Sequence, residues 1–288
     1  MALAVTGCGS DDDDSTTTSA STGTTAAATA TVNDAAVALL PAEVKSKGTL
    51  TVAADASYPP NEFFDKDGKT IIGLDPDLAQ ALGTALGLKM EVKNAGFDGI
   101  IAGLASGKYD LGMSSFTDNK EREKVVNFVT YLSAGTSFFV NAQKNPAITD
   151  LASLCGYKVA VEKGTVQLDD ATAQSKKCGS KKLTVLPYPD QNGANQALAS
   201  GRADVSMADS PVADYQVKLS NGQLKLAGTP YGTAPYGIAI PKNLDITKAL
   251  QAALKGLITD GTYQKILDKW GLEKSAAIAD PVINGAQD

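Results

Sequence analysis

The residues best suited to binding chemistry stand at the ends of two short apolar segments of the chain. One segment ends in Ser114 and Ser115, with Thr117 just beyond it and Arg122 five residues later. The planar guanidinium of an arginine matches a carboxylate through two hydrogen bonds and keeps its charge when water is excluded. The second segment ends in Asp209, a lone carboxylate suited to an ammonium group. Arg122 and Asp209 together could bind both ends of an α-amino acid, and ordinary structural ion pairs are the alternative.

These two segments belong to a repeated pattern. Residues 104–115 are LASGKYDLGMSS and residues 198–209 are LASGRADVSMAD, so six of the twelve positions are identical. Each copy predicts a helix that ends at a glycine, Gly107 or Gly201, followed by a turn with an aspartate and a short apolar strand. One αβ unit used twice predicts two similar α/β lobes, with chance similarity as the alternative. Because open α/β sheets bind ligands beyond the carboxyl ends of strands, two such ends facing each other would form a cleft.

Alternating strand and helix patterns surround these two segments. Thr49–Ala54 predicts a small buried strand, and Asp75 followed by a proline predicts the N-cap of a helix. Two separate extended segments are expected at Val125–Tyr131 and Ser137–Asn141, and a long amphipathic helical region is expected over residues 246–270. Strands and helices that alternate with short connections predict a parallel-rich sheet in each lobe.

The predicted architecture is therefore an α/β fold of two similar lobes joined by two hinge strands, with a ligand cleft between the lobes. The chain would cross between the lobes near residues 133–140 and again near residues 227–237. The first lobe would hold residues 46–135 and 235–288, the latter part including the C-terminal helices, and the second lobe would hold residues 136–234.

Composition excludes several classes of function. The chain has 288 residues, of which 43% are apolar and 20% charged, so most of it can build a core. A net charge of −6 argues against nucleic acid as the main partner. The absence of histidine excludes histidine-based triads, metal sites and acid–base chemistry, and we expect no metal and no cofactor. No stretch reaches the roughly 18 apolar residues that a membrane span needs.

The N-terminus resembles a lipid-attachment signal. Residues 3–8, Leu-Ala-Val-Thr-Gly-Cys, resemble a bacterial lipobox in which Cys8 becomes the lipidated first residue. Residues 1–8 would then be the remnant of a lipoprotein signal, since the basic region before the apolar stretch is missing. The first part of the following segment consists almost entirely of Gly, Ser, Thr, Ala and Asp. Residues 9–45 are therefore expected to form a disordered tether. The alternative is that Cys8 is an ordinary residue near a ragged terminus.

Two further cysteines, Cys155 and Cys178, could form a disulfide if the protein is exported. A protein exported across the membrane meets oxidising conditions, and these two remain once Cys8 is lipidated. A bridge between them would close a loop of roughly 24 residues and contribute about 3 kcal/mol to stability. Two buried free thiols are the alternative.

From Leu50 to Leu272 the chain resembles the polar amino acid family of extracellular solute-binding proteins, which feed ABC importers. The resemblance covers about three quarters of the chain and implies the two-lobe fold of type II periplasmic binding proteins. It rests on motifs in a fixed order: DASYPP at 55–60, GLDPDLA at 73–79, FDGII at 97–101, MSS at 113–115 continuing to Arg122, GTVQ at 164–167, GRAD at 201–204 and DGTY at 260–263.

The resemblance implies a zwitterion site. Arg122 would hold the α-carboxylate of the ligand, helped by the backbone N–H of Thr117 and by the N–H groups of residues 165–166. That turn opens a helix, and the free N–H groups of a helix N-terminus suit an anion. Asp209, the carbonyl of Ser115 and the hydroxyl of Thr117 would hold the α-ammonium group.

The resemblance also implies contacts to the ligand side chain. Tyr58 and Phe97 would enclose it from two sides, with core packing as the alternative for an aromatic residue. Asp55 would meet its distal polar end, and Gln167 would be a second polar contact. The expected ligand-binding set is Asp55, Tyr58, Phe97, Ser114, Ser115, Thr117, Arg122, Thr165, Val166, Gln167 and Asp209.

The expected function is that of the substrate-binding component of an ABC importer. It would bind a polar or basic L-amino acid of the Gln, Arg, Lys or His type and deliver it to a membrane permease, acting as a monomeric, non-enzymatic, extracytoplasmic lipoprotein. Asn61 and Val166 depart from common family residues beside the pocket and leave the exact ligand open. The alternatives are a ligand-sensing protein for a membrane receptor and a dehydratase-like enzyme on the same scaffold.

Overall fold

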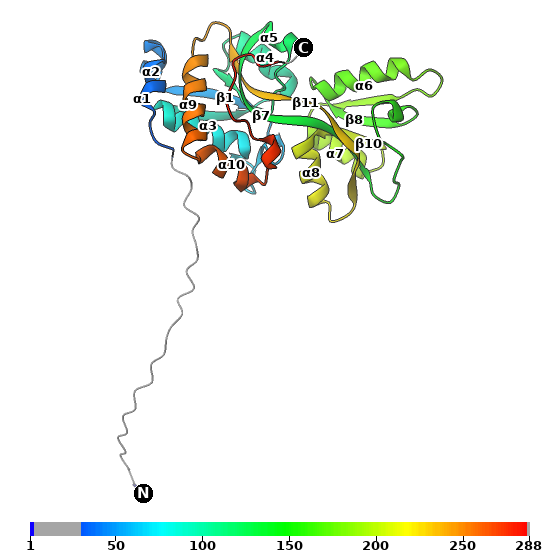
Figure 1. Cartoon of the computed structure of the whole chain (residues 1–288). Coiled ribbons are helices and arrows are strands. Elements are labelled where there is room, and N and C mark those ends of the chain that lie inside the picture. The colour runs from blue at the N-terminus through cyan, green and yellow to red at the C-terminus, as the bar shows by residue number, and fades with distance from the viewer. Residues whose placement is uncertain (3–29, 287–288) are drawn as a thin grey trace.

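The structure is a computed structural model that describes residues 1–2 and 30–286 (Figure 1). Two α/β lobes lie side by side and share one sheet of eight strands. Cys8 and most of the predicted tether lie outside the described residues. In spatial order the strands are β5 (Lys89–Asn94), β1 (Thr49–Ala54), β6 (Leu111–Gly112), β11 (Leu224–Pro241), β7 (Val126–Asn141), β10 (Val205–Asp209), β8 (Lys158–Glu162) and β9 (Thr184–Tyr188).

The two halves of the sheet have equivalent topology, so the prediction of two similar lobes is confirmed. Strands β5, β1 and β6 pair in parallel in the first lobe, as β9, β8 and β10 do in the second. The repeated aspartates do the same work in both: Asp110 accepts the N–H of Thr51 at 2.7 Å, and Asp204 accepts the N–H of Lys158 at 2.9 Å. Each aspartate therefore fixes the start of one short strand beside the first strand of its lobe.

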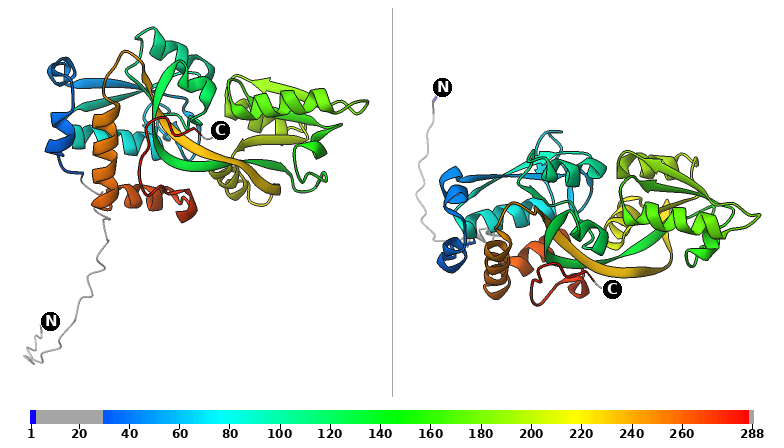
Figure 2. Two further views of the ribbon diagram at one scale, coloured as in Figure 1. Left: turned by 45° about the horizontal axis from the view of Figure 1, so that its top comes forward. Right: turned by 90° about the horizontal axis from the view of Figure 1, so that it is seen from above.

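Two long strands join the lobes, as expected (Figure 2). β7 is one continuous strand, so the prediction of separate segments at Val125–Tyr131 and Ser137–Asn141 is wrong. The intervening residues stay extended because β11 runs antiparallel beside them and pairs with Ser133 and Ala134. The register of the β7–β11 pair shifts between residues 227 and 234, where β11 passes from one lobe to the other.

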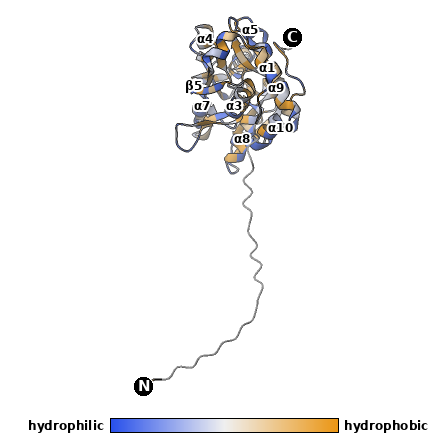
Figure 3. Cartoon of the chain, turned by 90° about the vertical axis from the view of Figure 1, so that its left-hand side faces the viewer, coloured by the Kyte–Doolittle hydropathy of each residue, from blue (hydrophilic) through white to orange (hydrophobic). Residues whose placement is uncertain are grey.

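Helices cover the sheet and bury its apolar faces. In Figure 3 the helices carry both apolar and polar residues, as amphipathic helices that pack on a sheet do. A small sheet of β2 (Ser57–Tyr58), β3 (Glu62–Phe64) and β4 (Ile71–Ile72) lies beside the first lobe's helices. The longer helices are α3 (Leu74–Leu86), α4 (Phe97–Ala105), α9 (Thr247–Thr259) and α10 (Thr262–Trp270) in the first lobe, and α6 (Val166–Lys177), α7 (Gln191–Ala199) and α8 (Ser210–Leu219) in the second.

Two helices lie before β1, which corrects the predicted extent of the tether. Helices α1 (Asp34–Ala38) and α2 (Ala42–Lys47) lie within residues 9–45 or overlap their end. Asn33 caps α1 through its side chain, and Ala36, Leu40 and Val44 are buried in the core of the first lobe. Apolar residues at helical spacing thus order a segment whose beginning resembles a linker.

The start of α3 also differs from prediction. The helix begins at Leu74 with Gly73 as N-cap, so Asp75 is not the cap but a buried residue of the first turn. Gly73 has a φ of 137° and a Cβ there would meet the backbone of Asn61, so only glycine fits before this helix. The side chain of Asp75 points into the lobe instead of back along the chain, with consequences for the site described below.

The C-terminal segment completes the first lobe. Val282 accepts the N–H of Thr130 at 2.9 Å, and Asn284 donates its N–H to Phe128 at 3.0 Å, so the segment pairs with β7 where that strand lacks its second-lobe neighbour β10. In the second lobe Cys155 and Cys178 are joined in a disulfide with Cα atoms 5.3 Å apart. Within residues 30–286 no helix combines the length and apolar character that crossing a membrane requires.

Candidate functional site

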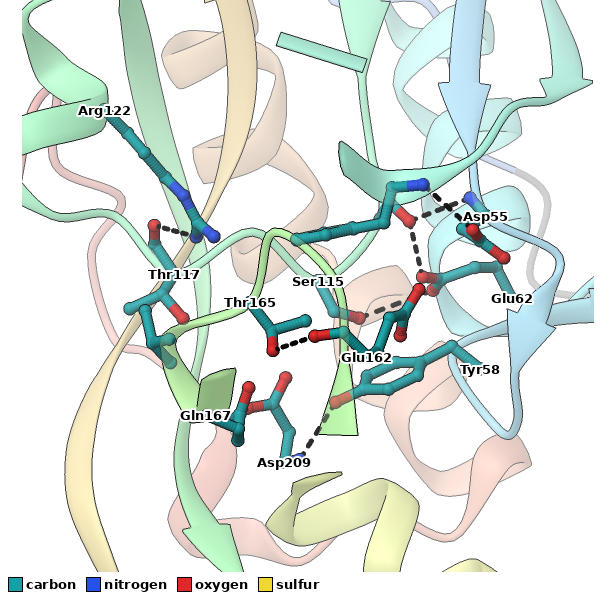
Figure 4. Close-up of a pocket in the computed structure, with 13 residues that line it drawn as sticks. Asp55, Tyr58, Glu62, Ser115, Thr117, Arg122, Glu162, Thr165, Gln167 and Asp209 are labelled. Atoms are coloured by element: carbon teal, nitrogen blue, oxygen red, sulfur yellow. Dashed lines mark hydrogen bonds between the residues drawn. The ribbon is translucent and has the colours of Figure 1, made fainter. Parts of the chain in front are cut away.

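A pocket between the lobes gathers all eleven residues expected to bind ligand (Figure 4). Two further residues, Glu62 and Glu162, line it as well. The space among these residues, open solvent included, is about 290 Å³. The lining residues are Asp55, Tyr58, Glu62, Phe97, Ser114, Ser115, Thr117, Arg122, Glu162, Thr165, Val166, Gln167 and Asp209.

Arg122 and Thr117 occupy one end of the pocket (Figure 4). Helix α5 (Lys120–Glu123), which begins after Asn119, presents Arg122, and its guanidinium donates to the carbonyl of Thr117 at 2.9 Å. A second donor nitrogen reaches the carbonyl of Gly164 in the other lobe, also at 2.9 Å. The guanidinium carbon lies 5.5 Å from the ring centre of Phe97, which orients the planar group. Arg122 is therefore held in place by carbonyls and a ring, without a carboxylate partner among the salt bridges of residues 30–286.

The N-terminus of α6 faces the same end of the pocket from the second lobe. Thr165 caps this helix and accepts the N–H of Leu168 at 3.3 Å, while its hydroxyl donates to the carbonyl of Glu162 at 2.7 Å. The N–H groups of the first turn, beginning with Val166, lie next to the pocket with the partial positive charge of a helix N-terminus. The Arg122 end of the pocket thus suits a carboxylate.

Asp209, the last residue of β10, is an acidic group of the pocket lining. Gln167 donates to its carboxylate at 2.7 Å, and the backbone N–H of Asp209 donates to the hydroxyl oxygen of Tyr58 at 2.9 Å. Burial raises the pKa of Asp209, whereas hydrogen bonds and the nearby charge of Arg122 act in the opposite direction. A ligand ammonium would pair with this carboxylate and remove the cost of its burial.

The far end of the pocket is acidic. Asp55 and Glu62 lie there from the first lobe, and Glu162 reaches it from the end of β8 in the second. Ser114 donates its hydroxyl to Glu62 at 2.8 Å, and Asp55 accepts the N–H of Phe97 at 2.9 Å. Burial raises the pKa of all three carboxyl groups, and that of Glu162 rises further through the charges of Asp55 and other nearby acids.

The walls of the pocket are aromatic. The ring of Phe97 stacks on Phe116 with centres 4.5 Å apart, which fixes the face that Phe97 turns to the pocket. Tyr58 also lines the pocket and is 6% exposed. Asn61, expected beside the pocket, lies behind it and donates to the hydroxyl of Ser115 at 2.8 Å. Ser115 itself has a φ of 54°, a left-handed conformation that turns its backbone at the end of β6.

The lobes are closed over the pocket. The hydrogen bonds that cross between them include Arg122 to the carbonyl of Gly164, the N–H of Asp209 to Tyr58, and the N–H of Gln191 to the hydroxyl of Ser57. The pocket is therefore lined from both sides, and a ligand within it can contact both lobes at once.

Sequence reasoning missed the two glutamates for different reasons. Glu162 ends β8 just as Asp209 ends β10, so the strand-end criterion that identified Asp209 would also have found Glu162. Glu62 begins β3 of the small sheet, and a glutamate at such a position normally points to solvent. Its burial depends on Ser114 and Ser115, which are more than 50 residues away in sequence.

Comparisons with known proteins agree with this geometry. The family described as bacterial extracellular solute-binding proteins, family 3, matches residues 50–273. The arginine-binding protein ArgT of Corynebacterium glutamicum is 37% identical over 241 residues, which cover 82% of this chain and 79% of ArgT. The L-cystine-binding protein TcyJ of Escherichia coli is 32% identical over 230 residues, covering 79% of this chain and 84% of TcyJ. A solved structure of an ancestral arginine-binding protein bound to arginine superposes with a TM-score of 0.73 at 38% identity, covering 78% of this chain and 98% of that one.

Proposed function

The chain belongs to the bacterial extracellular solute-binding proteins of family 3, and on that premise we propose that it binds a basic L-amino acid, L-arginine foremost, for an ABC importer. The observation that carries this choice of ligand is the charge of the pocket. Four carboxyl groups line it against one guanidinium, and all four carboxyl groups are buried. A ligand with two cationic groups and one carboxylate would complement that lining, whereas a neutral side chain would leave the far acidic end unpaired.

The order of groups along the pocket supports the same ligand. Arg122 and the first turn of α6 would take the α-carboxylate, and Asp209 would take the α-ammonium group. The side chain would then extend between Tyr58 and Phe97 toward the acidic end. A guanidinium offers five N–H donors in one plane, enough to serve several carboxylate oxygens at that end.

ArgT is named for arginine and TcyJ for L-cystine, so the ligand class needs a direct test. The distal half of cystine is another zwitterion and would bring a carboxylate to Asp55 and Glu62. Like charges at close range repel, so the acidic end disfavours cystine.

We further propose that the protein delivers its ligand without changing it. Raised pKa values of pocket carboxyl groups are also what an acid catalyst needs, which keeps a dehydratase-like enzyme as the rival proposal. Against it, the carboxyl groups are distributed as counter-charges for a zwitterion and a distal cation. Incubation with arginine and with carboxylic acids that carry a hydroxyl leaving group, followed by chromatography, separates the two proposals, since a binding protein returns every compound unchanged.

The setting of the protein is also proposed. Lipidation of Cys8 would anchor it outside the cytoplasmic membrane as a monomer, in a compartment where the disulfide between Cys155 and Cys178 persists. A membrane permease would then receive the ligand. A sensor that presents the ligand to a receptor is the rival, and arginine uptake by cells with and without the gene distinguishes the two.

The ligand is tested by isothermal titration and thermal unfolding of the full chain, after unfolding and refolding to remove any carried-over ligand. We expect L-arginine to raise the melting temperature most, L-lysine less, and L-glutamine and L-cystine least. Agmatine, which lacks the α-carboxylate, should bind far more weakly than arginine. Equal binding of glutamine or cystine would overturn the choice of a basic ligand, and no binding of any amino acid would overturn the zwitterion site.

A further inference from the structure

Two buried carboxyl groups, Glu62 and Asp75, lie next to each other where the pocket meets the first lobe. Glu62 is fully buried and lines the pocket, whereas Asp75, at 1% exposure, lies behind it and does not. Neither group takes part in a salt bridge within residues 30–286. Two adjacent carboxylates buried without a cation would repel each other and lack solvation, so a proton must neutralise one of them.

The hydrogen bonds indicate which group carries the charge. Asp75 Oδ2 accepts the N–H of Ser115 and the hydroxyl of Tyr131, each at 2.8 Å, and both donors favour the ionised form. Glu62 accepts one short hydrogen bond, from Ser114 at 2.8 Å, and one long one, from Ser115 at 3.4 Å.

One buried oxygen without a hydrogen-bond donor, Asp75 Oδ1, is consistent with a proton on Glu62. Asp75 Oδ1 is buried and accepts no hydrogen bond from the described groups. Ser115 donates to both carboxyl groups, through its N–H to Asp75 and through its hydroxyl to Glu62, so the two groups are neighbours and a protonated Glu62 can donate to Asp75. Since buried acceptors in proteins are nearly always satisfied, the orphan oxygen supports a shared proton.

We propose that Glu62 and Asp75 share one proton in the ligand-free protein, that the cationic end of the ligand displaces it, and that Asp75 thereby sets the specificity of a pocket it does not touch. This inference rests on the proposed binding of a basic amino acid. Asp75 is a positioning residue, because it acts on the ligand only through the protonation of Glu62.

The charged and titratable groups around the pair are consistent with this role. Asp55, at the end of β1, is a further acid facing Glu62, and Tyr131 on β7 faces Asp75. Burial, followed by the charge of Asp75, raises the pKa of Glu62 well above its usual value, and burial raises the pKa of Asp75 to about 6. Arg122 lies at the opposite end of the pocket, as Figure 4 shows, so a cationic group of the ligand can be the counter-charge of the pair.

The expected consequence is a difference in pH dependence between ligands. A guanidinium or ammonium group beside Glu62 favours its ionised form, so arginine binding releases a proton. The affinity for arginine therefore increases by up to about tenfold for each unit by which the pH rises. A neutral side chain leaves the proton in place, so the affinity for citrulline or glutamine stays level over the same pH range. The preference for a cationic ligand would therefore grow as the pH rises.

The test is calorimetric titration of the full chain with L-arginine and with L-citrulline, in two buffers of different ionisation enthalpy. We expect about one proton released with arginine and none with citrulline. Arginine binding without proton release would overturn the shared proton and leave the proposed function intact. A failure of both arginine and lysine to bind would instead overturn the proposed function.

Two variants locate the proton. In Asp75→Asn the new amide can donate to Glu62 and keep it ionised, so arginine should still bind but release no proton. In the control, Asp118→Asn, a buried acid outside the pocket is removed, and arginine binding should still release the proton. Proton release that persists in Asp75→Asn would overturn the proposal. If Asp75→Asn does not fold, the infrared absorption of protonated carboxyl groups in the unaltered protein should fall by about one group on adding arginine, and an absorption that does not change would overturn the proposal.

Discussion

Gly164 and Asp98 touch across the boundary between the two lobes: a Cβ atom on Gly164 would lie 2.9 Å from the Cα atom of Asp98. Gly164 also has a φ of 78°, and its carbonyl accepts the interlobe hydrogen bond from Arg122. Thr165, the next residue, lines the pocket. Closure of the lobes thus brings the backbone of one against the backbone of the other at the edge of the ligand site, where a side chain would not fit.

The first prediction concerns this contact. Gly164→Ala should lower ligand affinity by about tenfold or more, equivalent to about 1.4 kcal/mol, because the added methyl group opposes closure. The control is Gly222→Ala, whose φ of 83° imposes the same backbone strain in open space. Both variants should lose similar thermal stability, and only Gly164→Ala should lose affinity by calorimetry. Equal affinities in the two variants would show that closure tolerates the methyl group.

The second prediction concerns the guanidinium at the carboxylate end. Arg122→Lys should weaken arginine binding by about a hundredfold, since a lysine keeps the charge but loses the planar fork and the stacking on Phe97. The melting temperature of the ligand-free protein should change little, because the contacts of Arg122 in the described part of the chain are two carbonyls and the rings of Phe97 and Phe116, with no salt bridge. Arg202→Lys, at an exposed position in the second copy of the repeat, is the control and should bind normally. Titration calorimetry of both variants decides the matter, and retained affinity in Arg122→Lys would remove this residue from the ligand site.

The two-lobe architecture could be predicted because the repeat encodes the same backbone contacts twice. Asp110 and Asp204 bond equivalent N–H groups, and Gly107 and Gly201 adopt φ values of 75° and 74°. These are local requirements of an αβ turn, and such requirements restrict which residue types can stand at each position, so they can be recognised in the sequence. The continuity of β7 could not be predicted, because its middle section is held extended by β11, about a hundred residues later.

The candidate site divides in the same way. Residues at strand and helix ends, such as Arg122, Thr165 and Asp209, could be placed because their positions follow from the local pattern and the family resemblance. Glu62 could not, since its burial arises from tertiary packing against another segment. The displacement of Asp75 from cap to buried acid has a similar cause: its partners, Ser115 and Tyr131, come from β6 and β7.

The third prediction concerns the disulfide. It spans a sequence separation of 23 residues, and closure of such a loop restricts the unfolded chain by about 3 kcal/mol. Replacing Cys155 and Cys178 together by serine should lower the free energy of unfolding by roughly that amount in urea titrations. Arginine affinity should hold within about threefold, because neither residue lines the pocket. If reduction of the unaltered protein and the double variant both leave the unfolding midpoint unchanged, the bridge does not form or does not stabilise the second lobe.

The fourth prediction concerns Asp118, which ties the C-terminal segment to the first lobe. Its carboxylate accepts the N–H of Gly285 at 2.7 Å, and it is 2% exposed. Burial, with the charge of Glu123 adding to it, raises the pKa of Asp118 to about 7, above its usual value of 3.8. The folded protein therefore holds a proton that the unfolded chain has lost between these two values. Protonation favours folding, and the contribution of Asp118 to stability falls as the pH rises from about 4 to about 7.

Asp118→Asn should remove this dependence, because the amide oxygen can still accept from Gly285 and carries no charge at any pH. As the pH rises through that window, the free energy of unfolding of the variant should increase relative to that of the unaltered protein. The increase should reach up to about 1.4 kcal/mol for each unit by which folding raises the pKa of Asp118. Thermal unfolding at several pH values measures the difference, with the exposed Asp245→Asn as control. Because protonation of Asp118 in the folded state is the only source of the expected trend, a difference in melting temperature that stays constant with pH would mean that this carboxylate remains ionised in the fold.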